Sequence, residues 1–288
     1  MLPLHEFRLL VEDDFRLLML VEDGMFQFKF VPLDLIVKRS KLTNNAVAKS
    51  INKLHKLGLL SRGAAYSGYR LTYKGYDCLA LNFLVNSNYI ISIGQSLGVG
   101  KEADVYAAKT PTDEVVAIKF HRLGVAGFRK VRRVRSYLES SSLPWIFRSK
   151  VAAESEYHAL STLYLAGVRV PKPYAYNRHS LVMSYIEGDP LYICDYLPDP
   201  MAFFHMVLDE LRKSYSDGGL IHGDLSEFNI IVSPLIKPLI IDWPQALPIS
   251  HPSAKMLLKR DIFNLVSFFN RRFGLKLKLD DAFSYIVC

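Results

Sequence analysis

The chain has 288 residues, half of them hydrophobic, and a formal net charge of +8, which excludes a largely disordered protein. Three widely spaced cysteines with no CxxC pair argue against a disulfide framework or a zinc site and fit a reducing compartment. The N-terminus carries acids where a signal peptide needs a basic start, and no apolar run is long enough to span a bilayer, so we expect a soluble, cytoplasmic protein.

The first elements along the chain are predicted to be three helices. Apolar residues at helix-like spacing cover residues 4–22, and Pro32 opens a short second helix that runs through Val37. Thr43 supplies the N-cap of a third helix, and Gly58 stands where a helix-ending glycine is expected.

A hairpin is predicted to follow the third helix. Two short apolar runs, 59–62 and 69–73, are joined by a glycine-containing turn, and a further helix covers 74–83. Helices followed by a hairpin are typical of the winged-helix domain, whose third helix can enter a nucleic-acid groove while the hairpin contacts the backbone. We therefore predict a winged-helix domain over residues 1–90.

Basic residues are concentrated in two blocks. Lys38 to Lys74 holds nine Lys or Arg and no acid, and 119–150 holds nine against one acid. Such concentration favours surfaces that bind polyanions over ordinary solvated faces. The residues expected to contact nucleic acid are Lys49, Lys53, Lys56, Arg62 and Arg70. The alternative is a winged helix that contacts proteins or only packs against the rest of the chain.

The second region, residues 91–288, is predicted to mix strands and helices. Strand, glycine turn, strand and strand cover 91–120; the later helices are expected at 151–166, 200–217 and 254–273, and the later strands at 179–186 and 229–242. This α+β order is that of a two-lobed protein kinase, with lobes of about 91–183 and 184–288.

The strongest chemical pattern is IHGDLSEFN at 221–229, followed by LIID at 239–242. An acid, an Asn five residues later and a second acid after an apolar strand form the catalytic constellation of kinases. Asp224 can accept the proton of an attacking hydroxyl, and Asn229 and Asp242 are hard oxygen ligands for Mg²⁺. We predict catalytic roles for Asp224 and Asp242, with Asn229 and Asp242 as metal ligands.

A glycine-containing loop between two strands, GVGKEADVY at 98–106, fits a phosphate-binding role because glycines let backbone N–H groups approach phosphates. VAIK at 116–119 follows and ends at Lys119, the residue type that holds the nucleotide phosphates in kinases. A buried lysine needs an acidic partner. Glu156 is the best candidate, with Glu154 as the alternative.

The strand 181–186 is predicted to lead into the hinge between the lobes. Met183 would line the adenine pocket, and the backbone near Ser184 and Ile186 would bond the adenine edge. The complete expected ATP-binding set is Gly98, Val99, Gly100, Lys101, Val105, Ala117, Lys119, Glu156, Met183, Ser184, Ile186, Ile231 and Ile241.

Features of ordinary protein kinases are missing after Asp242. Trp-Pro-Gln follows it in place of Phe-Gly, no Ala-Pro-Glu occurs, and 46 residues remain. This length leaves no room for the activation segment and helical subdomain that bind peptides. Ser226 also replaces the usual lysine two residues after the catalytic Asp. We expect the phosphate acceptor to be held differently.

With these motifs the sequence resembles the RIO family of atypical protein kinases, of the Rio2 type that begins with a winged helix. The blocks that carry the resemblance, over nearly the whole chain, are GVGKEADVY, KFHRLG with FRKVRRVRSY, IHGDLSEFN, IDWPQ, SHPSA and KRDIFNLVSFF. The chain ends soon after the last helix, which resembles the archaeal members. It departs from the family at Ala103, where serine is common, and at Trp243, where Phe is commoner.

The resemblance implies an ATP- and Mg²⁺-dependent serine/threonine kinase and ATPase in small-ribosomal-subunit maturation, with Mn²⁺ as a substitute metal. Asp242 would also accept the γ-phosphate transiently. Implied partners are the rRNA and ribosomal proteins of the subunit precursor, with RNA bound by the winged helix, and we expect a monomer with no membrane contact. The block 122–148 would be a flexible loop near the γ-phosphate, with Ser136 and Ser140 to Ser142 as candidate autophosphorylation sites.

Two alternatives remain open at this point. Small-molecule phosphotransferases of the aminoglycoside or choline kinase kind share the HGD and IDW blocks, but they usually lack a winged helix and this glycine loop. A ribosome-assembly factor that uses nucleotide as a switch, with little protein kinase activity, would keep Asp224, Asn229 and Asp242.

Overall fold

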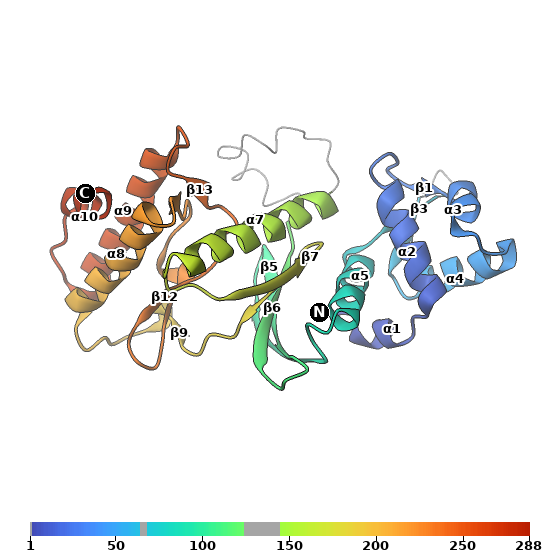
Figure 1. Ribbon diagram of the computed structural model, residues 1–288, viewed down its shortest axis with the longest axis horizontal. Coiled ribbons are helices and arrows are strands. Elements are labelled where there is room, and N and C mark those ends of the chain that lie inside the picture. Colours follow the sequence, from blue (N-terminus) through green and yellow to red (C-terminus); the bar gives the residue numbers. More distant parts are fainter. Residues whose placement is uncertain (1, 64–67, 124–144) are drawn as a thin grey trace.

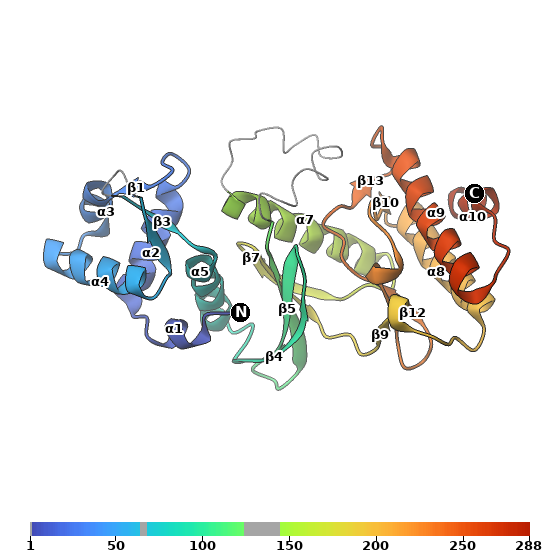
Figure 2. The same ribbon diagram turned by 180° about the vertical axis from the view of Figure 1, so that it is seen from behind.

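The computed structural model describes residues 2–63, 68–123 and 145–288. An N-terminal helical domain, a five-stranded sheet and a C-terminal helical lobe follow one another along the long axis of the molecule (Figure 1), and Figure 2 shows the same order from behind. Over these residues, no helix combines the length and the apolar character needed to cross a lipid bilayer.

The N-terminal domain has the predicted winged-helix order. Its elements are α1 (Leu4–Arg8), α2 (Glu12–Gly24), β1 (Val31–Pro32), α3 (Leu33–Ser40), α4 (Asn44–Lys56), β2 (Leu60–Arg62), β3 (Gly68–Leu71) and α5 (Tyr73–Asn86). The three short strands form an antiparallel sheet in the order β1-β3-β2, so β1 adds a strand to the predicted hairpin.

The local signals in α4 behave as predicted. The Thr43 hydroxyl accepts a hydrogen bond from the Ala46 backbone N–H at 3.3 Å, and Gly58 has a φ of +72° beyond the helix end. Val47, Ile51 and Leu54 are buried on one face. The single helix expected over 4–22 is wrong.

The chain breaks between α1 and α2 because Asp14 caps the second helix. Its carboxylate accepts a hydrogen bond from the Val11 backbone N–H at 3.0 Å, which satisfies a donor at the start of α2. The apolar spacing continues across this break, and periodicity alone therefore did not reveal it.

The central sheet is antiparallel in the order β4-β5-β6-β8-β7, with strand bounds Ser92–Val99, Ala103–Lys109, Val115–His121, Ser180–Ser184 and Pro173–Asn177 in that order. Helix α7 (Trp145–Leu165) packs on β6, β7 and β8, and it begins earlier than the predicted residue 151. Because side chains alternate across a strand, β6 places Val116, Ile118 and Phe120 in one core and Lys119 and His121 on the α7 side.

The C-terminal lobe comprises β9 (Asp189–Pro190), η2 (Leu191–Ile193), α8 (Pro200–Ser216), β10 (Leu220–Ile221), η3 (Glu227–Asn229), β11 (Ile230–Val232), β12 (Pro238–Ile240), β13 (Leu247–Pro248), α9 (Ala254–Phe273) and α10 (Leu279–Val287). Helix α10 packs on α8 and α9 and was not predicted. The buried pair Ala282 and Ile286, four residues apart, is the periodic signal that could have indicated it.

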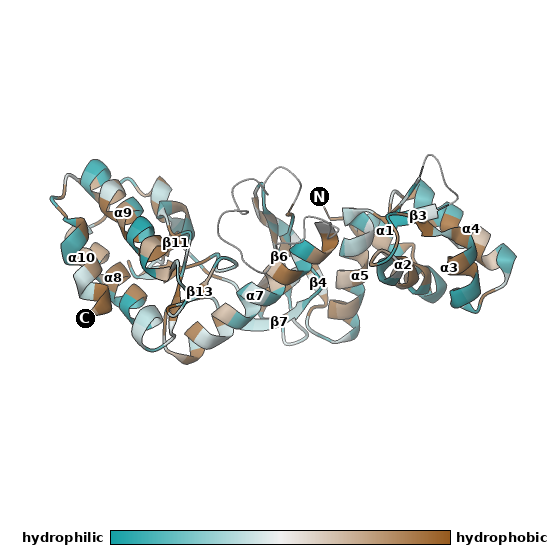
Figure 3. Cartoon of the chain, turned by 90° about the horizontal axis from the view of Figure 1, so that it is seen from above, coloured by the Kyte–Doolittle hydropathy of each residue, from teal (hydrophilic) through white to brown (hydrophobic). Residues whose placement is uncertain are grey.

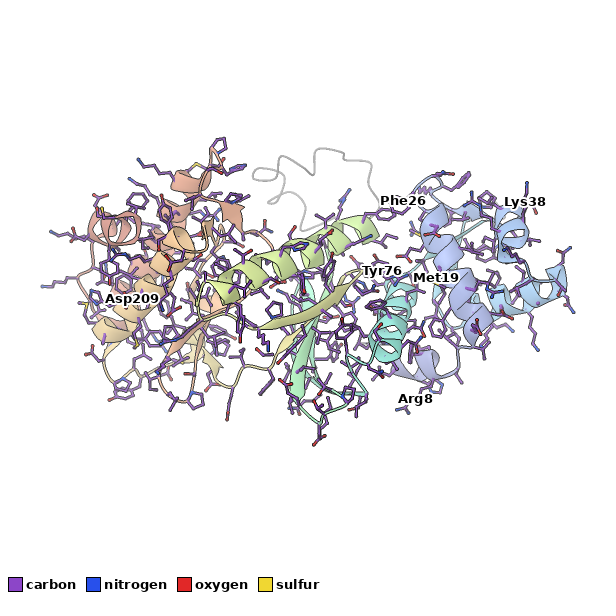
Figure 4. All side chains as sticks on the ribbon, in the orientation of Figure 1. Arg8, Met19, Phe26, Lys38, Tyr76 and Asp209 are labelled. Carbon is purple, nitrogen blue, oxygen red and sulfur yellow. The ribbon has the colours of Figure 1, made fainter. Side chains whose placement is uncertain are left out.

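The winged-helix domain shares a hydrophobic core with the central sheet. Leu81 and Leu84 of α5 pack in one cluster with Tyr106 and Ile118, and Figure 4 shows Tyr76 at this junction. Hydrophobic residues occur in all three parts of the chain, as the brown segments of Figure 3 show, and the buried ones among the described residues form three clusters. The two domains are therefore packed together rather than joined only by a linker.

Candidate active site

The centre of the site is a buried lysine between two carboxylates. Lys119 on β6 donates to Oε1 of Glu156 on α7 at 2.7 Å and to Oδ1 of Asp242 at 2.6 Å. Lys119 and Glu156 are 6% and 1% exposed. Burial alone would lower the pKa of Lys119, but the two carboxylates outweigh it and raise that pKa. The lysine is therefore a fixed cation that joins both lobes.

Glu156 also lies against Trp243 and His121. Its Oε1 also accepts the backbone N–H of Trp243 at 3.2 Å. His121 lies two residues after Lys119 on the same face of β6, and its Nε2 is 2.9 Å from Glu156 Oε2, without hydrogen-bond geometry. Burial opposes ionisation of Glu156, but the Lys119 charge overcomes it and lowers the pKa of Glu156. Glu154, the alternative partner, instead accepts from the Tyr176 hydroxyl.

The loop that carries Asp224 is held by a buried histidine. His222 Nδ1 accepts the Asp224 backbone N–H at 3.3 Å, and Nε2 lies 3.0 Å from the Ile241 carbonyl. Burial lowers the pKa of His222, so the neutral ring donates through Nε2 and accepts through Nδ1. Its ring packs on Trp243 at 4.5 Å between centroids. His222 thus fixes Asp224 relative to the strand end that carries Asp242.

Helix α9 also contacts the loop that carries Asp224. Asp261 Oδ2 accepts the Gly223 backbone N–H at 2.8 Å, and burial raises the pKa of Asp261 to about 7. Arg260 donates to the Gly223 carbonyl and lies 3.6 Å from Asp224 Oδ1. Gly223 has a φ of +76°, which an L side chain rarely adopts. The Asp224 side chain itself is 70% exposed, so a substrate can reach it.

Asn229 and Asp242 lie on adjacent segments. Asn229 Nδ2 donates to the Asp224 carbonyl at 3.0 Å, and the Asn229 carbonyl accepts the Ile241 N–H at 3.0 Å. The amide oxygen of Asn229 can therefore accept a hydrogen bond or bind a metal ion. Asp242 has a φ of +67°, a strained conformation that often marks functional sites.

The donor set fits a magnesium ion held partly by phosphates. The described residues contain no group of three or more His, Cys, Asp or Glu placed to hold a metal. Mg²⁺ is typically bound by one or two protein oxygens together with nucleotide phosphates and water. Asn229 and Asp242 would supply such a pair.

The predicted phosphate loop covers the end of β4, which includes Gly98 and Val99, and the turn that leads into β5. Gly98 and Gly100 are exposed, and a Cβ built on Gly98 would meet none of the described atoms within 4 Å. The described protein therefore does not itself require glycine there, which fits close approach by a ligand. Val99 and Lys101 are exposed on this loop, and Val105 is half-buried on β5.

The hinge prediction stays a prediction. The Ser184 backbone N–H donates to the Lys172 carbonyl at 2.8 Å, so a bond from Ser184 to adenine would use its carbonyl as acceptor. Ile186 lies beyond the end of β8. Met183 is half-buried against the C-lobe core and pairs in register with Ala117. Ile231 and Ile241 are half-buried in the C-lobe.

The predicted nucleic-acid residues divide into two groups. Lys49, Lys56 and Arg62 are exposed. Lys53 Nζ donates to Asp14 Oδ2 at 2.5 Å and to a backbone carbonyl, so a phosphate would compete with this ion pair, and the contact at Lys53 stays a prediction. Arg70 is half-buried, with Nε on the Ser61 hydroxyl and its guanidinium over the Phe30 ring. Ser136 and Ser140 to Ser142 lie outside the described residues.

No role was assigned from the sequence to His222, His121, Arg260 or Asp261. His121 could have been found from its place two residues after Lys119 on a strand, which puts both on one face. Arg260 and Asp261 belong to the KRD block, which helped to indicate the family but had no role assigned to it. Their contacts join segments nearly forty residues apart, and no spacing rule predicts such contacts.

Comparison with known families agrees with this geometry. The RIO domain matches residues 104–282, and the family described as Rio2, N-terminal matches residues 7–87. The chain belongs to the RIO kinase family. Both matches together place it in the Rio2 branch of these atypical serine/threonine-protein kinases.

Curated Rio2 relatives align with most of this chain. A serine/threonine-protein kinase rio2 of Dictyostelium discoideum is 40% identical over 269 residues, 93% of this chain, and this chain spans about half (51%) of that protein's length. A RIO-type kinase Rio2 of Methanocaldococcus jannaschii is 37% identical over 91% of this chain and 99% of its own length.

A solved Rio2 structure has the same fold. The Rio2 kinase of Chaetomium thermophilum, crystallised as an ADP/Mg²⁺-phosphoaspartate complex, superposes with a TM-score of 0.84 at 36% identity. The superposition covers 99% of this chain and 89% of that one. The two-lobed RIO fold preceded by a winged helix is thus confirmed.

Proposed function

We propose that the chain is an ATP- and Mg²⁺-dependent serine/threonine protein kinase with ATPase activity that acts in maturation of the small ribosomal subunit. The observation that carries the proposal is the Lys119 ion pair with Glu156 and Asp242, beside a loop that presents Asp224 and Asn229. These are the groups that position and neutralise a transferring phosphoryl group.

Each site residue would have its own role in phosphoryl transfer. Lys119 would bind nucleotide phosphates, Asn229 and Asp242 would hold the metal ion, and the metal would neutralise charge on the phosphates. Asp224 would take the proton from a serine or threonine hydroxyl, or from water, as the oxygen attacks phosphorus. The bond from the γ-phosphorus to the bridging oxygen breaks, and ADP leaves with that oxygen.

Asp242 is also the proposed transient phosphate acceptor. Its carboxylate oxygen would take the γ-phosphoryl group from ATP, and water would then release inorganic phosphate. The Rio2 kinase of Chaetomium thermophilum forms a complex that contains a phosphoaspartate, which supports this role by analogy. In this chain Asp242 is 44% exposed at the side chain, and its second oxygen is not used by Lys119.

Incubation with γ-labelled ATP and purified small ribosomal subunits tests the proposal. Label on serine or threonine would support the kinase activity, and hydroxylamine-labile label that disappears in Asp242→Asn would support the aspartyl-phosphate. The phosphotransferase assignment would be contradicted if neither labelled protein nor free phosphate rose above the level of an Asp224→Ala control.

A second candidate is a nucleotide switch that hydrolyses ATP slowly and phosphorylates protein little. The observation in its favour is the short segment between Asp242 and α9, which begins at Ala254. This segment contains β13, paired with β10, and the described C-lobe therefore offers little of the peptide platform of ordinary kinases. Release of free phosphate without labelled subunit protein would favour this candidate.

RNA binding by the winged helix is a further part of the proposal. Lys49 and Lys56 are exposed on α4, and Arg62 is exposed at the end of β2. We expect Lys49→Ala with Lys56→Ala to weaken binding to small-subunit rRNA and to reduce the slope of log K against log salt by roughly one to two. Filter binding or anisotropy at several salt concentrations would measure both quantities.

The matched control for this prediction is Lys276→Ala with Lys278→Ala, which removes the same charge from exposed positions before α10. Lys53 is unsuitable because its loss would leave Asp14 without its ion-pair partner. An unchanged salt slope in the α4 variant, or an equal change in the control, would count against RNA binding through α4.

A further inference from the structure

Arg122 joins the end of β6 to carboxylates from two domains. Its Nε donates to Oδ2 of Asp104 at 2.9 Å, and Nη1 and Nη2 donate to the two oxygens of Asp77 at 2.5 and 3.1 Å. Asp104 is the second residue of β5, directly after the phosphate loop, whereas Asp77 lies on α5 of the winged-helix domain. The Arg122 side chain is 14% exposed and that of Asp77 only 2%. A buried fork of this kind fixes both distance and orientation.

The surroundings of this cluster hold the guanidinium in one place. It lies over the rings of Tyr73 and Phe120 at 5.2 and 5.6 Å. His179 Nε2 is 2.8 Å from Oδ1 of Asp77, and burial lowers the pKa of His179 to about 4, so the neutral ring donates this hydrogen bond. Asp77 thus accepts hydrogen bonds from both His179 and Arg122.

The phosphate loop is anchored to the same residue. The Arg122 backbone N–H donates to the Glu102 carbonyl at 2.6 Å. Residues 98–102 are exposed, and the loop therefore has little packing of its own to fix it. Its base is set by the pairing of Asp104 with Val99 in the sheet and by the ion pair of Asp104 with Arg122.

We propose that Arg122 is a positioning residue for the nucleotide and that Asp77 makes helix α5 of the winged-helix domain a structural part of the ATP site. In this arrangement Arg122 transmits the position of α5 to the phosphate loop through Asp104 and Glu102. It also lies three residues from Lys119, so a displaced Arg122 would disturb the lysine strand and the loop together. The proposal rests on binding of ATP by this loop, but it is independent of the phosphate acceptor.

A simpler role would be to hold the two domains together, and the chain supplies a matched control for that role. Arg178, in the turn between β7 and β8, donates to both carboxylate oxygens of Glu22 on α2, with the shortest bond at 2.7 Å. This second ion pair also joins the two domains and is largely buried. Within the described part of the chain, none of the contacts of this pair reaches the phosphate loop.

The test compares Asp77→Asn and Arg122→Lys with Glu22→Gln in the full chain. Each carboxylate-to-amide change removes one interdomain charge from the winged-helix side. We expect Asp77→Asn and Arg122→Lys to raise the Kd for MgATP and the KM for ATP about tenfold, the effect of losing one good charged hydrogen bond, with a much smaller change in kcat. Glu22→Gln should leave both constants within about twofold of wild type, whatever its effect on thermal stability.

A third variant keeps the proposal testable even if Asp77→Asn or Arg122→Lys folds poorly. Asp104→Asn breaks only the loop side of the cluster, and it should reproduce the raised Kd while the domains stay joined through Asp77. Equal Kd values in wild type, Asp104→Asn and Asp77→Asn would overturn the proposal, as would an equal loss in Glu22→Gln. If wild-type protein failed to bind MgATP in isothermal titration, the proposed function would fall along with it.

Discussion

Replacing Asp224 with alanine is expected to lower the rate of phosphoryl transfer by about 10²–10⁴-fold, the usual contribution of a positioned base. MgATP binding should change by less than about threefold, because it depends on the phosphate loop, Lys119 and the metal ligands rather than on the base. Single-turnover kinetics with labelled ATP and isothermal titration would measure the two quantities separately.

Two companion variants sharpen this prediction. Asp224→Asn keeps the shape of the side chain but cannot take a proton, so it should be nearly as slow as the alanine variant. Asp280→Ala, an exposed carboxylate at the start of α10, should behave as wild type. Loss of tight MgATP binding in Asp224→Ala, or an Asn variant with full activity, would count against a base at this position.

Much of the fold was predictable because its signals are local. The cap at Thr43, the glycine after α4 and the alternating apolar residues of β6 each depend on neighbours within a few residues. The break between α1 and α2 was missed since apolar spacing continues through it. Helix α10 was missed because its short apolar face gains stability only from packing on α8 and α9.

The site residues, too, were predictable only where their signals are local or follow the order of known motifs. Spacing within the HGD and IID blocks indicated Asp224, Asn229 and Asp242, and motif order indicated Lys119 with Glu156. The supports of these residues come from distant segments: Asp261 reaches Gly223 from α9, and Asp77 reaches Arg122 from another domain. The ion pair of Lys53 could not be predicted for the same reason, since its partner Asp14 lies on a different helix. A helical face in the sequence does not reveal which of its charges are already paired.

Replacing Lys119 with methionine is expected to destabilise the nucleotide-free protein by about 3–5 kcal/mol, the cost of leaving a buried charge without its partner. Glu156 is the residue left uncompensated, because it is 1% exposed whereas Asp242 can be solvated. Urea or guanidinium unfolding of the two proteins at pH 8 would measure the difference.

The pH dependence of stability distinguishes loss of the Lys119 charge from simple loss of packing. In the wild type the Lys119 charge lowers the folded-state pKa of Glu156, so this contribution to stability is present above the unfolded pKa of Glu156 and is lost as pH falls through the folded value. Without Lys119, burial raises the folded-state pKa of Glu156 instead, and its penalty grows as pH rises from about 4 toward 8.

Adding Glu156→Gln to the Lys119→Met variant removes the buried charge of Glu156 and so measures its effect. The Lys119→Met/Glu156→Gln double variant should recover part of the lost stability at pH 8, because its amide can still accept the Trp243 N–H without a buried charge. Its stability should also lose the added dependence on pH between about 4 and 8 seen in the single variant. A double variant less stable than Lys119→Met, or a single variant whose deficit is the same at both ends of this range, would show that Lys119 acts through packing alone.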